Sequence, residues 1–128
     1  MADLLPGGHI SSGQMARAAR EFGTPLYVYD RQTIVDQCAR ILDMPNAYGL
    51  EPRYAMKANS GRAILQLVTG AGIGIDASSV NEALRAEAAG VEPAGIMLTT
   101  QEVPEGEKRQ ILEDLMSRGM RYNVCSLR

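Results

Sequence analysis

Lys57 is the residue of this sequence whose type and position best suit chemistry. It ends a predicted strand, residues 53–57, and the carboxyl ends of strands are where β/α enzymes place catalytic groups. A lysine amine in a low-dielectric pocket holds its proton less tightly, so it can attack a carbonyl and form a Schiff base. Strand alternation places the small Ala55 on the same face, which leaves space for a ligand. The alternative is a solvated lysine, the far commoner case.

Asp76 is the second candidate, near the end of the next predicted strand, residues 73–77. A carboxylate there could hold a cationic lysine or orient the surroundings of a bound ligand. It could also be a turn aspartate that accepts backbone N–H groups before the following helix. Ser79 and Glu82 have the spacing of a helix capping box, which already accounts for both.

Asn59 follows the candidate lysine after one residue and has two possible roles. Its side chain could contact a ligand bound near Lys57, or it could fix the start of the helix that we predict from Ser60. The spacing does not separate these alternatives.

Other chemistries and partners have little support. His9 is the single histidine and stands near the amino terminus, so we expect no metal site and no Ser-His-Asp triad. Cys38 and Cys125 fit no metal-ligand pattern, and we expect reduced thiols in a cytoplasmic protein. The net charge is -2 and no run of Lys or Arg forms a basic stripe, which argues against nucleic acid as a partner. No apolar run approaches the ~20 residues that span a bilayer, and we expect neither a membrane segment nor a signal peptide.

A regular alternation of strands and helices must position Lys57 and Asp76. We predict helices at 11–22, capped by Ser11 or Ser12, and at 31–43, capped by Asp30, with a β-rich run at 26–29 between them. Strands follow at 53–57, 73–77, 95–99 and 121–125, separated by helices that start at Ser60, Ser79 and Pro104. Such alternation predicts an α/β fold with a parallel sheet, either a (β/α)8 barrel or a doubly wound sheet.

Several sequence boxes occur in a fixed order. They read FGTPLYVYD at 22–30, YAMKAN at 54–59, GIGIDASSVNE at 72–82, AEAAG at 86–90 and YNVCS at 122–126. Together they resemble the fold-type III, alanine-racemase-like pyridoxal-phosphate decarboxylases, most of all the diaminopimelate decarboxylases. One departure follows the third strand, where many members have Gly or Asn and then a lysine, and this chain has TTQE at 99–102.

This resemblance implies both a cofactor and a fold. Lys57 would carry pyridoxal 5'-phosphate as a Schiff base, with Ala55 and Asp76 beside it. Residues 31–128 would be the N-terminal half of a pyridoxal-phosphate-binding (β/α)8 TIM barrel, truncated after the fourth barrel strand. Residues 1–30 would contribute the strand at 26–29 to a second β domain. We therefore expect an amino-terminal fragment of a homodimeric parent.

The resemblance also implies a reaction, the decarboxylation of meso-diaminopimelate to L-lysine, with a small amino acid as substrate. A decarboxylase acting on ornithine, arginine or carboxynorspermidine is an alternative, as is a non-catalytic regulatory homologue. A racemase fits less well, because that family's lysine box runs on to Tyr-Gly-His and this chain has Ser60, Gly61 and Arg62 there. We expect the fragment alone to be inactive, since the family's phosphate loop and substrate-binding segments come after residue 128.

Overall fold

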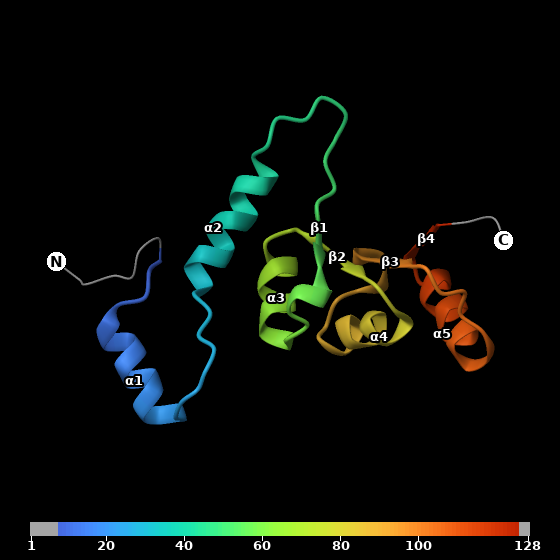
Figure 1. Ribbon diagram of the computed structural model, residues 1–128. Coiled ribbons are helices and arrows are strands. Elements are labelled where there is room, and N and C mark those ends of the chain that lie inside the picture. Colours follow the sequence, from blue (N-terminus) through green and yellow to red (C-terminus); the bar gives the residue numbers. More distant parts are fainter. Residues whose placement is uncertain (1–7, 126–128) are drawn as a thin grey trace.

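Four parallel strands form one sheet in chain order. The computed structural model describes residues 8–125 (Figure 1). The strands are β1 (Arg53–Ala55), β2 (Gly74–Ala77), β3 (Ile96–Thr100) and β4 (Arg121–Val124). Ser126 of the last sequence box and residues 1–7, on which the expected absence of a signal peptide rests, lie outside the described residues. The predicted parallel sheet is confirmed.

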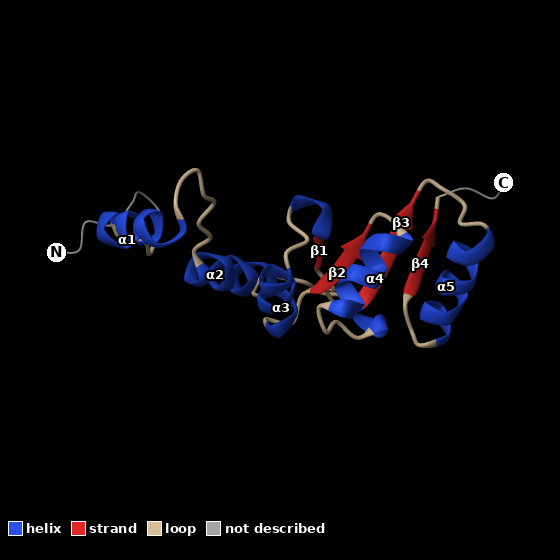
Figure 2. Cartoon of the chain, turned by 90° about the horizontal axis from the view of Figure 1, so that it is seen from below, coloured by secondary structure: helices blue, strands red, loops and turns tan. Residues whose placement is uncertain are grey.

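The helices that connect the strands lie on one face of the sheet. They are α3 (Arg62–Gly70), α4 (Val80–Ala88) and α5 (Gly106–Ser117), and Figure 2 shows them together on the same side. A doubly wound sheet would carry helices on both faces, whereas a barrel carries them only outside. The one-sided arrangement therefore favours a segment of a barrel over a doubly wound sheet.

The core fills the space between the strands and these helices. Alternate strand residues point toward the helices, as the pleat requires, and Ile75, Ile96 and Leu98 are fully buried. Leu65 of α3 and Leu115 of α5 are fully buried against them. Burial of this kind is the main favourable term in folding, so the sheet and its helices hold each other in place.

Each connecting helix ends in the same motif. A glycine with positive φ follows the C-cap, and its N–H donates to a carbonyl of the last helical turn. The N–H of the next residue donates to the carbonyl one residue earlier in that turn, which is the pattern of a Schellman motif. The residue after the glycine is apolar and buried in all three cases. The glycines are Gly72, Gly90 and Gly119, and the buried residues are Ile73, Val91 and Met120. The endings turn the chain into the next strand and add to the core.

Two helices precede the sheet. In α1 (Ser12–Phe22), Ser11 and Gln14 form a capping box, and in α2 (Arg31–Leu42), Asp30 accepts from the N–H groups of Gln32 and Thr33 at 2.9 and 3.3 Å. Both predicted helices and their caps are therefore confirmed. None of the described helices is long and apolar enough to cross a membrane.

The strand expected at 26–29 is not formed within the described chain. Residues 23–30 run from α1 to α2 without strand pairing, and Tyr27 is 92% exposed. A β-rich sequence becomes a strand only against a neighbour, because the pairing supplies its backbone hydrogen bonds. The resemblance assigns the pairing of this segment to a second β domain, so the strand stays a prediction that the described residues do not test.

Two predicted helix starts were wrong. The N-cap of α3 is Gly61 rather than Ser60, and α5 begins at Gly106 after Glu105 rather than at Pro104. Ser60 instead accepts a hydrogen bond from Arg85 of α4 at 3.0 Å. Pro104 is buried in the connection before α5.

Leu65 provides a test of this core. We expect Leu65→Ala to lower the free energy of unfolding by about 3 kcal/mol, because it removes a fully buried side chain and leaves a cavity. Leu50→Ala is the matched control, since Leu50 is 42% exposed, and its effect should be much smaller. Urea unfolding followed by circular dichroism measures both. Equal losses in the two variants would contradict the described core.

Candidate active site

Lys57 stands just beyond the end of β1. It lies in a short 3-10 turn, η1 (Met56–Ala58), so the prediction that it ends the strand itself was wrong by two residues. The strand alternation therefore stops at Ala55 and does not fix the direction of Lys57. Met56 is fully buried, whereas the side chain of Lys57 is exposed. The described residues place Lys57 at the carboxyl end of β1 but do not enclose it in a pocket.

Asp76 and Ala55 lie side by side on neighbouring strands. The register sets Ala55 opposite Asp76, and Asp76 opposite Met97 of β3. These residues alternate with the buried core residues, so they belong to the face of the sheet that carries no helix. The structure thus brings together two of the three predicted site residues, with the turn of Lys57 following directly from Ala55.

Asp76 has an unsatisfied carboxylate oxygen. Its Oδ1 is buried and has no hydrogen-bond partner among the residues that the structure describes. Buried polar atoms are almost always paired, so an orphaned one marks a place where another group belongs. The alternative, an aspartate that accepts backbone N–H groups in the turn, is not supported, because Glu82 accepts there instead. The Glu82 carboxylate accepts from the N–H and the hydroxyl of Ser78, both at 2.7 Å.

The expected capping box of α4 is therefore only half present. Ser79 caps the helix by accepting from the Glu82 N–H at 3.2 Å. Glu82 does not return the bond to Ser79, because its carboxylate bonds Ser78. For Asn59 the helix-start alternative is the one observed. Its side-chain oxygen accepts from the N–H of Gly61, the N-cap of α3, at 2.8 Å.

Charged side chains occupy the opposite, amino-terminal end of the open face. Arg53 crosses Gly74 and donates to the carbonyl of Gly95 at 3.3 Å. A Cβ on Gly74 would lie 2.9 Å from Arg53 Nη1 and 3.1 Å from the carbonyl oxygen of Gly95, so a larger residue there would force the Arg53 side chain to shift. Glu51 binds Arg53 at 3.4 Å and also Arg121 of β4. The Arg121 guanidinium, more than Arg53, lowers the pKa of Glu51.

This charged cluster was not predicted. Its members are separated by up to 70 residues, so no local spacing marks them. The only signal would have been that Arg53 and Arg121 each open a strand of a parallel sheet.

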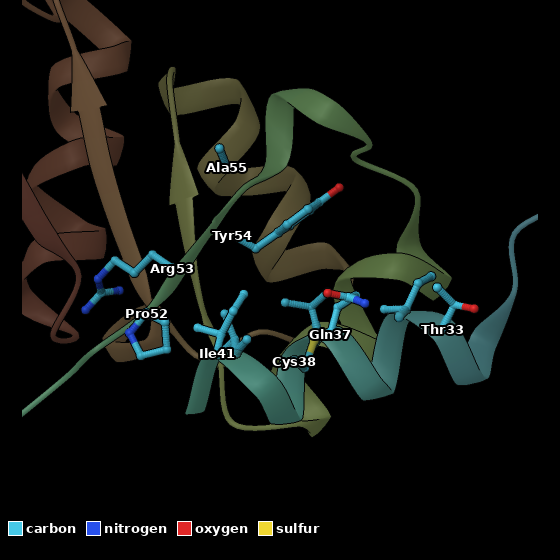
Figure 3. A pocket seen from close by; sticks show the side chains of 11 residues that line it. Thr33, Gln37, Cys38, Ile41, Pro52, Arg53, Tyr54 and Ala55 are labelled. Carbon is cyan, nitrogen blue, oxygen red and sulfur yellow. The ribbon is translucent and has the colours of Figure 1, made fainter. Parts of the chain in front are cut away.

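A cavity of about 310 Å3 lies between α2 and β1 (Figure 3). Arg53 and Tyr54 leave β1 in opposite directions beside it, and Cys38 contributes from α2. Burial raises the pKa of the Cys38 thiol, which makes it a poor nucleophile. Of the three candidate-site residues, Ala55 lines this cavity, whereas Lys57 and Asp76 do not.

The comparison with known families decides the identity of the fold. A family model described as the pyridoxal binding domain of pyridoxal-dependent decarboxylases matches residues 31–125. The chain belongs to this decarboxylase family.

Curated relatives of this decarboxylase domain are diaminopimelate decarboxylases. That of Methanothermobacter thermautotrophicus is 34% identical over 123 residues, covering 93% of this chain and 28% of the relative. That of Deinococcus radiodurans is 41% identical over 83 residues, covering 63% and 21%, and that of Streptomyces coelicolor is 36% identical over 113 residues, covering 85% and 24%. The chain thus spans about a quarter of the length of these relatives.

The residues of the decarboxylase domain fit pyridoxal phosphate. The cofactor carries an aldehyde, for which Lys57 offers an amine, and a ring whose surroundings can use an acceptor such as the orphaned Oδ1 of Asp76. Ala55 lies opposite Asp76 in the register, and its side chain is a single methyl group. The cofactor predicted from the sequence is confirmed at the level of the family.

The charged cluster predicts an acid-sensitive stability. Because the pKa of Glu51 is lowered in the folded chain, its contribution is fully present above the ordinary glutamate pKa and is lost as the pH falls through the lowered value. We expect Glu51→Gln to be less stable than the wild type at pH 7, with a gap that closes toward pH 3. Urea midpoints across this range measure it. Glu102→Gln is the control, and a gap that stays constant with pH would contradict the assignment.

Proposed function

We propose that this chain is the amino-terminal part of an enzyme that decarboxylates meso-diaminopimelate to L-lysine. The observation that carries the proposal is the grouping of Lys57, Ala55 and the orphaned Asp76 carboxylate at the carboxyl ends of β1 and β2, in a pyridoxal-binding domain. The relatives named above, all diaminopimelate decarboxylases, support this substrate over ornithine, arginine or carboxynorspermidine.

Each site residue has a part that follows from its chemistry. Lys57 Nζ is the nucleophile that would attach the cofactor covalently. Asp76 would supply a hydrogen-bond acceptor through its orphaned Oδ1, and the small side chain of Ala55 would leave room for the cofactor. When bound, pyridoxal phosphate supplies an electron sink for the electron pair released as carbon dioxide leaves. When not bonded to the cofactor, Lys57 Nζ would be free to carry a proton at the site.

The proposal includes the rest of the architecture. Residues 31–128 would form the first half of an eight-stranded barrel, with the open face inside and the helices outside. The one-sided helices support this arrangement, and so do the outer edges of β1 and β4, which no other described strand covers. The unpaired segment at 26–29 would join a second β domain. The enzyme would act in the cytoplasm as a homodimer.

Covalent trapping tests the role of Lys57. The sequence has two lysines, so Lys108 on the exposed face of α5 is an internal control. After incubation with pyridoxal phosphate and borohydride reduction, we expect the added mass mainly on Lys57, because Asp76 and Ala55 favour the cofactor there. Peptide mass spectrometry gives the ratio of the two labels. Lys57→Arg keeps the charge and should abolish the preference, whereas Lys108→Arg should leave Lys57 labelled. Equal labelling of both lysines would refute the proposal.

A polypeptide made of these 128 residues should not turn over diaminopimelate. It spans about a quarter of the length of its relatives, and the resemblance places the phosphate-binding and substrate-binding segments after residue 128. Release of carbon dioxide with added pyridoxal phosphate measures this, with one of the full-length relatives as the positive control. Turnover that depends on Lys57 would overturn the expectation and show that these residues suffice.

A further inference from the structure

The turn that carries Lys57 is closed by a hydrogen bond from Tyr54. The Tyr54 hydroxyl donates to the backbone carbonyl of Asn59 at 3.2 Å, so a side chain two residues before the turn binds the residue just after it. Burial raises the pKa of Tyr54, so the phenol keeps its proton at neutral pH and remains a donor. The bond spans η1 and ties its far end to β1.

A second hydrogen bond fixes the same turn to α3. Asn59 Oδ1 accepts from the Gly61 N–H at 2.8 Å, and a Cβ on Gly61 would lie only 3.0 Å from that oxygen. The backbone of the helix start therefore lies close against the side chain of Asn59. From the other side, Met56 anchors the turn, since it is fully buried in the core. Lys57 thus stands on a turn held at three points.

Tyr54 cannot itself touch a ligand bound beside Asp76. It lies opposite Ile75 in the register, and Ile75 is fully buried on the helix side of the sheet. Ala55 and Asp76 point to the other, open face. Any effect of Tyr54 on the site must therefore pass through the backbone of the turn, which makes it a positioning residue and not a catalytic one.

We propose that Tyr54 positions Lys57, by clamping the turn so that the lysine amine is directed to the open face beside Ala55 and Asp76. An exposed lysine has several rotatable bonds, and an unclamped turn would spread its amine over more positions. Holding a nucleophile in place is a large source of reactivity. This inference rests on the proposed function, in which Lys57 carries the cofactor.

Tyr54→Phe tests the clamp, because it keeps the ring and removes only the hydroxyl. The matched control is Tyr122→Phe. Tyr122 is half-buried on the same side of the sheet, and its hydroxyl has no hydrogen-bond partner within residues 8–125. Two measurements are made on the wild type and on both variants, each at a urea concentration equally far below its own unfolding midpoint. They are hydrogen exchange of the amides from 57 to 60 and the ratio of pyridoxal phosphate trapped by borohydride on Lys57 and Lys108.

In Tyr54→Phe we expect hydrogen exchange in the turn to be about fivefold faster and the ratio of label on Lys57 to label on Lys108 to fall by a similar factor. A factor of this size corresponds to the loss of one ordinary hydrogen bond. Tyr122→Phe should change neither. A trapping ratio unchanged in Tyr54→Phe would overturn the role of Tyr54, even if exchange became faster. Absence of any preference for Lys57 in the wild type would instead refute the proposed function, and the exchange rates would then decide separately whether the clamp exists.

Discussion

The parallel pairing of β1 with β2 is the constraint on which the candidate site depends. It sets Ala55 against Asp76 and, by the same register, Tyr54 against Ile75. Because side chains alternate across a strand, one pairing decides both which residues face the core and which face the open side. A slip by one residue would bury the Asp76 carboxylate among apolar side chains, where an unpaired charge is very costly. Packing of the core therefore stabilises the register of β1 and β2, and this register brings Ala55 and Asp76 together.

Much of this arrangement could be predicted from the sequence. The alternation of β-rich and helical segments, the helix caps and the order of the motifs were enough to predict the four strands, the intervening helices, and Lys57 and Asp76 as candidate site residues. These features are local, and local chemistry determines them. The Asp30 cap is an example, since it requires only residues within one turn of a helix.

The sequence pattern was insufficient where contacts outside a regular element determine the structure. The strand expected at 26–29 stays a prediction, because its pairing needs a neighbour that the described chain does not supply. Lys57 continues the alternation of β1 in sequence, yet the buried Met56 and the bond from Tyr54 to Asn59 turn the chain two residues earlier. The cluster of Glu51, Arg53 and Arg121 joins residues up to 70 positions apart and could not be predicted from any short stretch of sequence.

The two ends of the open face differ in a way that separates stability from chemistry. At the amino ends of the strands, Glu51 and Arg121 satisfy one another, and Arg53 bonds a backbone carbonyl over a glycine that makes room for it. At the carboxyl ends, Asp76 retains an unsatisfied oxygen and Lys57 an exposed amine. A β/α sheet places catalytic groups at the carboxyl end and stabilising contacts at the amino end. Among the described residues, the orphaned Asp76 oxygen and the exposed Lys57 amine therefore lie at the end where β/α enzymes bind their ligands, while the charged groups at the other end bind one another.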